Sequence, residues 1–390
     1  MFDFDTPVDR RGTNSVKWDM MEALYGVPPG DGLAMWVADM DFPAPPAVNE
    51  ALRRAADHGV HGYFGDDSAY KASITGWMSG RHGWEVDPEW ILTTHGLVQA
   101  TALAVQTFTA PGEGVILFTP VYHAFHRVIR ANERRIVESP LVEADGRYRM
   151  DLKALAGRLT GRERMVVLCS PHNPGGRVWS REELRRLAAF CEAHDLVLVS
   201  DEIHHDLVFP GHEHVVMPLA APEIVHRLVM LTATTKTFNI AGGLTGNVII
   251  PNARLRARFR ATLAASGTSP SRIGVLMATA AYAEGAPWLD ALVAYIAENA
   301  RVFDAGVAAI PGARSMRLEA TYLAWIDFSG TGMEPGEIAR RVERRGRIAA
   351  SHGPTFGRGG ESWMRFNLAT PRVRVEEAVR RLQAAFADLQ

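Results

Sequence analysis

Residues 228–238 read Leu-Val-Met-Leu-Thr-Ala-Thr-Thr-Lys-Thr-Phe, a short apolar run followed by hydroxyl residues around one lysine, Lys236. The apolar run is typical of a buried strand that ends shortly before the lysine. Two earlier apolar runs end in a similar way, one just before Asn173 and the other at Asp201. Because the carboxyl ends of parallel strands meet at one edge of a sheet, we expect Asn173, Asp201 and Lys236 to lie in one crevice.

Helix signals between these strands favour a parallel sheet. Residues 180–183 read Ser-Arg-Glu-Glu, a capping box that predicts a helix to about His194. That helix supplies the crossover which a parallel pair of strands requires, so residues 165–250 predict a doubly wound α/β fold. Further strands are predicted at 90–94, 115–118, 246–250, 321–328 and 362–368. Further helices are predicted at 46–58, 68–82, 95–108, 124–132, 254–265, 273–283, 287–309, 334–345 and 375–389.

The length and composition of the chain fit two domains. Its 390 residues, 47% of them hydrophobic, are enough for a large domain and a smaller one. We predict that residues 46–285 form the large domain, and that residues 1–45 and 286–390 form a smaller α+β domain. The helix at 287–309 is long enough to link them, and the aromatic residues near the N-terminus need a surface on which to pack.

The charge and cysteine content indicate which kinds of partner the protein binds and in which cellular compartment it lies. The 42 basic and 44 acidic side chains give a net charge of −2, which offers no reason to bind nucleic acid or an anionic membrane. Cys169 and Cys191 are too few for a disulfide framework and are interpreted as buried thiols. Residues 1–5 lack the features of a signal peptide, and no apolar run reaches the ~18 residues of a membrane span. We therefore expect a cytoplasmic protein that acts on a small molecule.

A lysine and a carboxylate in one crevice predict a particular cofactor. A desolvated lysine amine forms a Schiff base with an aldehyde, and a carboxylate keeps a pyridinium nitrogen protonated. Pyridoxal 5'-phosphate requires both from its protein. We therefore predict this cofactor, with Lys236 and Asp201 as catalytic residues and with Tyr122, just past a strand end, stacked on its ring.

The phosphate and substrate groups need further ligands. A strand, a glycine and a helix start at Gly96, Leu97 and Val98 predict backbone N–H donors for the phosphate. Thr235 would add a hydroxyl donor, and Asn173 would bond the phenolic oxygen of the cofactor. A guanidinium suits bidentate binding of a carboxylate, which predicts that a substrate α-carboxylate binds Arg365, a cation in a strand-like run.

Each candidate also has a structural interpretation. Lys236 alone could be a surface lysine, Asp201 a helix cap and Arg365 a member of an ion pair. Their order, each at the end of an element, favours an active site over these alternatives. The histidine pairs 204–205 and 212/214 have no third ligand nearby in the sequence, so they are interpreted as loop histidines and no metal is predicted.

Six motifs carry a family resemblance: 35–42 (Met-Trp-Val-Ala-Asp-Met-Asp-Phe), 82–84 (His-Gly-Trp), 170–177 (Ser-Pro-His-Asn-Pro-Gly-Gly-Arg), 200–204 (Ser-Asp-Glu-Ile-His), 236–242 (Lys-Thr-Phe-Asn-Ile-Ala-Gly) and 365–371 (Arg-Phe-Asn-Leu-Ala-Thr-Pro). With them, the chain resembles the fold-type I pyridoxal-phosphate enzymes along its whole length. Within that group it is similar to the MalY/PatB-like cystathionine β-lyases, which are C–S lyases. The resemblance implies an aspartate aminotransferase-like fold.

The resemblance also implies residue roles and a partner. It assigns His204 to the cofactor site, at a position where many aminotransferases have a tyrosine. Tyr63 resembles the tyrosine that reaches the phosphate of a neighbouring subunit, which implies a homodimer with shared active sites. We also expect Trp36, as a substrate-binding residue, to lie around the entrance of the site, together with the loop 61–67 and His123. Many aminotransferases carry a phosphate-binding arginine where this chain has Leu244, as the resembled lyases do. Residues 241–244 read Ala-Gly-Gly-Leu where relatives usually show Ala-Gly-Leu, so this loop is expected to differ in shape.

The implied reaction is α,β-elimination. A cysteine S-conjugate or a cystathionine-like substrate would give a thiol, pyruvate and ammonia. An aminotransferase, or a decarboxylating or oxidatively deaminating relative, could use the same residues. A regulatory interaction protein on this fold is a further alternative of a different class.

Overall fold

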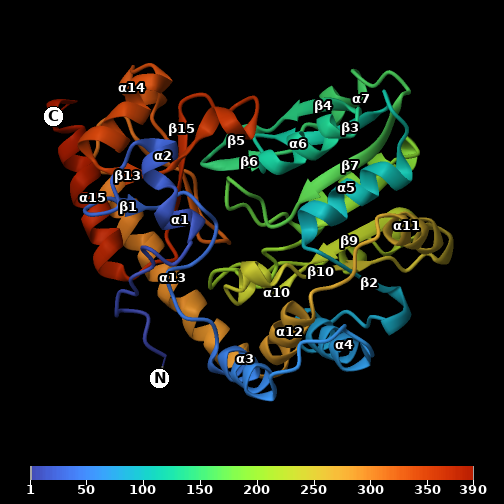
Figure 1. Cartoon of the computed structure of the whole chain (residues 1–390). Coiled ribbons are helices and arrows are strands. Elements are labelled where there is room, and N and C mark those ends of the chain that lie inside the picture. The colour runs from blue at the N-terminus through green and yellow to red at the C-terminus, as the bar shows by residue number, and fades with distance from the viewer. Residues whose placement is uncertain (1, 390) are drawn as a thin grey trace.

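A seven-stranded sheet lies at the centre of the larger part of the molecule in the computed structural model, which describes residues 2–389 (Figure 1). Every strand but β10 runs in the same direction, which confirms the predicted mainly parallel sheet. In spatial order the strands are β2 (Ile91–Thr94), β10 (Gly246–Ile249), β9 (Leu228–Thr232), β8 (Val197–Asp201), β7 (Glu163–Cys169), β3 (Gly114–Thr119) and β4 (Arg135–Pro140).

Helices cover both faces of this sheet because its strands are apolar on both sides. In β7, Met165 and Val167 belong to one buried cluster, whereas Val166 and Leu168 belong to the other. Such continuous apolar strands are typical of parallel sheets. The first cluster includes residues of α5 (Leu97–Phe108), α6 (His123–Ala131) and α11 (Ala253–Ala265). The second includes residues of α3 (Pro46–His58), α4 (Ser68–His82), α8 (Arg181–Ala193) and α12 (Arg272–Glu284).

The smaller part contains a four-stranded antiparallel sheet with helices packed on it. In spatial order its strands are β11 (Arg314–Ser315), β12 (Leu323–Asp327), β15 (Trp363–Asn367) and β14 (Ser351–His352). Its helices are α13 (Ala286–Val307), α14 (Pro335–Arg340) and α15 (Arg372–Ala385). Figure 1 shows α13 extending from this part toward α12 and α3. The boundaries 46–285, and 1–45 with 286–390, remain a prediction.

Several predicted elements change at their ends or are new. Trp90 belongs to a short 3-10 turn before β2, and the predicted helix 334–345 stops at Arg340 and continues as a wider π-type turn. The capping box of Ser180 and Glu183 is present as predicted. Elements that the sequence patterns did not predict include α1 (Val16–Asp19), α2 (Met21–Tyr25), β5 (Val142–Ala144), β6 (Arg147–Arg149), α7 (Leu152–Ala156), α9 (Met217–Ala220), β1 (Leu33–Ala34) and β13 (Ile348–Ala349).

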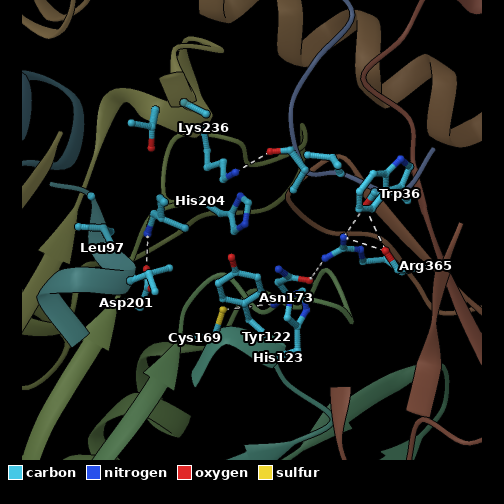
Figure 2. Close-up of a pocket in the computed structure, with 18 of the residues that line it drawn as sticks. Trp36, Leu97, Tyr122, His123, Cys169, Asn173, Asp201, His204, Lys236 and Arg365 are labelled. Atoms are coloured by element: carbon cyan, nitrogen blue, oxygen red, sulfur yellow. Dashed lines mark hydrogen bonds between the residues drawn. The ribbon is translucent and has the colours of Figure 1, made fainter. Parts of the chain in front are cut away.

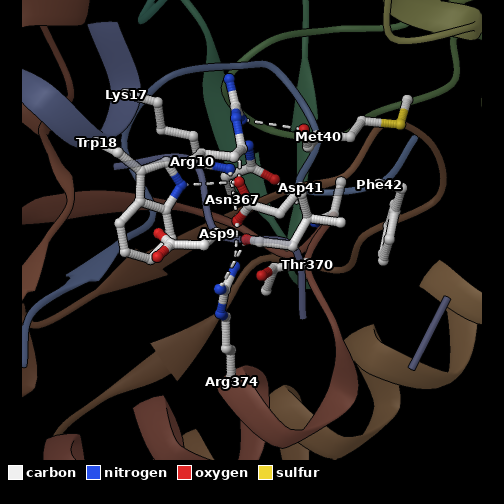
Figure 3. A network of polar contacts seen from close by, with 12 residues as sticks. Asp9, Arg10, Lys17, Trp18, Met40, Asp41, Phe42, Asn367, Thr370 and Arg374 are labelled. Atoms are coloured by element: carbon white, nitrogen blue, oxygen red, sulfur yellow. Dashed lines mark hydrogen bonds and ion pairs between the residues drawn. The ribbon is translucent and has the colours of Figure 1, made fainter. Parts of the chain in front are cut away.

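The N-terminal segment is attached to the smaller part by a buried ionic network (Figure 3). The wholly buried Lys17 places Nζ 3.1 Å from Oδ2 of Asp41, whose Oδ1 accepts hydrogen bonds from Trp18 Nε1 (2.9 Å) and Arg10 (3.0 Å). Arg374 of α15 lies 3.4 Å from the same carboxylate. Burial opposes ionisation of Asp41, but Lys17 and the other donors outweigh it and hold the pKa of Asp41 below its usual value.

The structure also bears on the predictions about the two cysteines and about membrane-spanning helices. Cys169 and Cys191 are buried, unpaired thiols, as predicted. A search of the helices within residues 2–389 finds none that is long and apolar enough to cross a membrane.

Candidate active site

A cavity of about 520 Å³ lies at the carboxyl edge of the large sheet, facing the smaller part. The strand register explains its position: Cys169 of β7 pairs with Asp201 of β8, and Asp201 pairs with Leu231 of β9. The three strands therefore end at the same level, and the residues that follow them enter one space.

The cavity brings together almost all of the predicted site residues. Those that line it are Trp36, Gly96, Leu97, Val98, Tyr122, Asn173, Asp201, His204, Thr235, Lys236 and Arg365. Tyr63 is the exception, because its side chain is fully exposed and lies outside the set of residues that line the cavity. A role for Tyr63 toward a second subunit remains a prediction.

Lys236 lies on α10 (Thr234–Thr237), the single helical turn after β9. Its Nζ donates a hydrogen bond of 2.6 Å to the carbonyl oxygen of Ala38, as Figure 2 shows. Burial lowers the pKa of Lys236 to about 8, against the opposing charges of Asp39 and Asp201. An amine with this pKa is a far better nucleophile near neutral pH than an exposed lysine.

Asp201 ends β8 on the floor of the cavity. Its Oδ1 accepts a hydrogen bond of 3.1 Å from the N–H of Ile203. Burial raises the pKa of Asp201 to about 7, and Lys236 opposes this shift only in part. A buried carboxylate with this pKa is stabilised in its charged form by a cationic partner, such as a protonated pyridine nitrogen.

Arg365 of β15 faces the cavity from the smaller part (Figure 2). Its Nη1 donates to Asn173 Oδ1 (2.9 Å), and its Nη2 donates to the carbonyl oxygen of Trp36 (2.7 Å) and to Ser351 Oγ (3.2 Å). The Nε atom is buried and has no hydrogen-bond partner among residues 2–389. Burial lowers the pKa of Arg365 to about 10, so it stays charged at neutral pH. These bonds use three of the five N–H groups of the guanidinium, so the site holds a fixed cation whose Nε donor is free for an anion.

The start of α5 forms the opposite wall. Gly96 precedes this helix with φ of 84°, a left-handed conformation that glycine adopts at little cost. Within the described chain, no side chain caps the helix, so the first N–H groups, including those of Leu97 and Val98, remain available to an anion. The buried hydroxyl of Thr235 lines the same cavity.

Aromatic and histidine side chains complete the walls. Burial raises the pKa of Tyr122, lowers that of His123 to about 4 and lowers that of His204 to about 3. Both histidines are therefore neutral at physiological pH and act as uncharged polar groups.

Sequence patterns missed several groups in this cavity. The carbonyl oxygens of Trp36 and Ala38, which bind Arg365 and Lys236, have no signature because any residue supplies a carbonyl. Ser351 and Tyr25 lie in the smaller part, far from the strand-end motifs in the sequence. Leu244 does line the cavity, with φ of 50° and a half-exposed side chain, and a loop that differs from that of relatives remains a prediction.

This fold and cavity define the class of protein. Residues 33–382 match the family described as aminotransferase class I and II, and the chain belongs to that family.

Within this family, the chain is similar to several named proteins and solved structures. The chain is 41% identical to cystathionine beta-lyase PatB of Bacillus subtilis, over 98% of this chain and 100% of the relative. It is 33% identical to protein MalY of Escherichia coli, over 97% of each. Among solved structures it is similar to cystalysin of Treponema denticola, which contains a pyridoxal 5'-phosphate cofactor (TM-score 0.96, 36% identity, 100% of both chains). It is also similar to the PLP-bound C-S lyase of Staphylococcus hominis (TM-score 0.91, 28% identity, 99% of both chains).

Proposed function

We propose that this protein is a pyridoxal-phosphate-dependent C–S β-lyase that eliminates the sulfur substituent of a cysteine S-conjugate or a cystathionine-like amino acid. The observation that carries the proposal is the meeting of Lys236, Asp201 and Arg365 in one buried cavity. The names of the relatives, which include a cystathionine beta-lyase and a C-S lyase, support the same reaction class.

The residues of the cavity fit pyridoxal 5'-phosphate. The uncapped start of α5 and the hydroxyl of Thr235 offer donors to a phosphate. Asp201 would hold the pyridine nitrogen, and Lys236 would bind the aldehyde carbon covalently. Tyr122 would contact the face of the ring, with Asn173 and His204 at its edge.

When bound, the cofactor supplies an electron sink for negative charge at the substrate Cα. Lys236, as a neutral amine, takes the Cα proton on Nζ, where its hydrogen bond to Ala38 orients it. Arg365 binds the substrate α-carboxylate through Nε, and its bonds to Asn173 and Trp36 fix the guanidinium. The C–S bond at Cβ then breaks, the sulfur leaves as a thiolate, and the remainder hydrolyses to pyruvate and ammonia.

We also propose a homodimer with shared active sites, in the cytoplasm. Tyr63 and Val60 expose large apolar side chains on one loop, as a surface that binds a second subunit does. The two free thiols fit a reducing compartment.

A product assay tests the reaction. The purified holoenzyme is incubated with cystathionine and with a panel of S-alkyl and S-aryl cysteines, and free thiol and pyruvate are measured. We expect equal amounts of the two products. Conversion of the cofactor to its pyridoxamine form, with a keto acid as product, would indicate an aminotransferase instead. Absence of thiol release across the panel, bulky conjugates included, would refute the lyase proposal.

The lowered pKa of Lys236 predicts the pH dependence of cofactor capture. Only the neutral amine attacks an aldehyde, so the initial rate at which apoprotein binds pyridoxal 5'-phosphate covalently should reach a plateau about one pH unit above its half-maximal value at pH 8. Below that pH it should fall about tenfold per pH unit. Visible absorbance after mixing at constant ionic strength measures this rate. A rate that still rises about tenfold per pH unit between about pH 9 and about 10.4, the pKa of an ordinary lysine, would contradict the shift.

A further inference from the structure

A second buried polar cluster lies behind the helical turn that carries Lys236. We call it the Asp206 cluster, and it consists of Trp77, His82, His205, Asp206 and Thr237. Asp206 is 4% exposed and His205 is 2% exposed. His205 lies in the turn after β8, as predicted for a loop histidine, but it is buried rather than exposed: His204 faces the cavity and His205 is packed against the ring of His82, 4.2 Å away.

The carboxylate of Asp206 is the centre of this cluster. Its Oδ1 accepts from Trp77 Nε1 (3.0 Å) and lies 2.8 Å from His82 Nε2. Its Oδ2 accepts from the hydroxyl of Thr237 (2.7 Å) and lies 3.2 Å from His205 Nε2. Three groups thus lie at hydrogen-bond distance from the two carboxylate oxygens. The Nε2 atom of His205 is close enough for an ion pair but makes no hydrogen bond within residues 2–389. Burial alone would raise the pKa of Asp206, but the neighbouring histidines hold it well below its usual value.

The cluster is better explained as an anchor than as a metal centre. His82, His205 and Asp206 do place one ligand atom each within 4.8 Å of one another. A cation among them would have to displace His82 from its hydrogen bond with the carboxylate. It would also compete with the hydrogen bonds that the carboxylate accepts from Trp77 and Thr237.

Thr237 connects this anchor to the candidate catalytic lysine. It is the residue directly after Lys236, and both belong to α10, which has four residues. A helix of one turn is not stable by itself, so its position depends on tertiary contacts. On the far side of the turn, Asn239 Nδ2 donates to the carbonyl oxygens of Met40 (3.0 Å) and Phe42 (2.8 Å).

We propose that Asp206 and Thr237 are positioning residues for Lys236. The hydrogen bond between them fixes the backbone of α10, and thereby the point from which Nζ reaches the cofactor and the substrate Cα. The proposal rests on the proposed role of Lys236. It does not depend on which sulfur substituent leaves, because Asp206 and Thr237 lie outside the cavity lining.

The chain contains a matched control on the same helical turn. Thr234 is as buried as Thr237, yet its hydroxyl has no hydrogen-bond partner within residues 2–389. Replacing either threonine with valine keeps the shape of the side chain and removes one hydroxyl. The two variants therefore differ in whether a bond to Asp206 is lost.

Two measurements on Thr237→Val, Thr234→Val and the rescue variant Thr237→Ser test the proposal. The first is hydrogen exchange of the backbone amides of residues 233–240 in apoprotein. We expect Thr237→Val to speed exchange there about tenfold or more, with no change elsewhere in the chain. The second is steady-state kinetics of the holoenzyme, in which kcat should fall about 10- to 100-fold while KM changes less than about threefold. Thr234→Val and Thr237→Ser should match the wild type in both.

Equal behaviour of the two valine variants, or failure of Thr237→Ser to restore the wild-type values, would overturn the proposal. If Thr237→Val does not fold, Thr237→Ala replaces it, because a smaller side chain cannot clash. The exchange measurement uses no substrate or cofactor. A failure of the lyase assay together with faster exchange in Thr237→Val would thus refute the proposed function and leave the anchoring of α10 standing.

Discussion

Replacement of Lys236 by alanine is expected to lower the rate of thiol release by at least about 10⁴-fold, because one side chain supplies both the covalent attachment and the proton acceptor. The variant should also lose the visible absorbance of lysine-bound cofactor. Reduction of the wild-type holoenzyme with borohydride, followed by peptide mapping, should place the cofactor on the peptide that contains Lys236.

Lysine 153 offers the control for this experiment. Lys153 is exposed on α7 and does not line the cavity. Lys153→Ala should therefore keep full activity and full absorbance. Retention of covalently bound cofactor in Lys236→Ala would show that another amine forms the bond, and the assignment of Lys236 would then be wrong.

Replacement of Asp41 by asparagine is expected to destabilise the fold by about 3–5 kcal/mol, since it leaves Lys17 buried without its main counter-charge. Asparagine has nearly the same shape as aspartate, so packing around Trp18 is retained. The urea midpoint of unfolding, followed by tryptophan fluorescence, measures the effect. Cofactor affinity should fall with it, because the segment that Asp41 fixes also supplies the carbonyl of Ala38 to Lys236.

Asp9 belongs to the same region and provides the comparison. It pairs with Arg11 on the surface, where both side chains are about half exposed, and Asp9→Asn should leave the urea midpoint unchanged. If Asp41→Asn were as stable as Asp9→Asn, the buried network would contribute nothing to the attachment of the N-terminal segment.

The site residues that could be predicted from the sequence are those that follow predicted strands or begin predicted helices. Asn173, Asp201 and Lys236 follow apolar runs, and the rule that parallel strands end together was sufficient to bring them into one cavity. The capping box of Ser180 likewise placed the start of α8 correctly.

What could not be predicted depends on contacts between distant segments or on weak local signals. β4 is half-exposed and includes Arg135 and Glu138, so its pattern does not alternate as a core strand does. The Asp206 cluster joins α4, the turn after β8 and α10, and no periodicity within one segment reveals such a meeting. The carbonyl contacts of Ala38 are likewise a property of the backbone path.

The attachment of the N-terminal segment has a consequence for biosynthesis. β1 pairs with β13, and Asp41 lies against Arg374, so residues that are synthesised before the large sheet bind residues that are synthesised after it. The sheet of the larger part can fold while the chain is still being made, since domains form as units during synthesis. The wall of the cavity formed by residues 36–38 can be completed only after β13, β15 and α15 have emerged. A nascent chain would therefore carry Lys236 in a folded sheet for some time before the pocket around it closes.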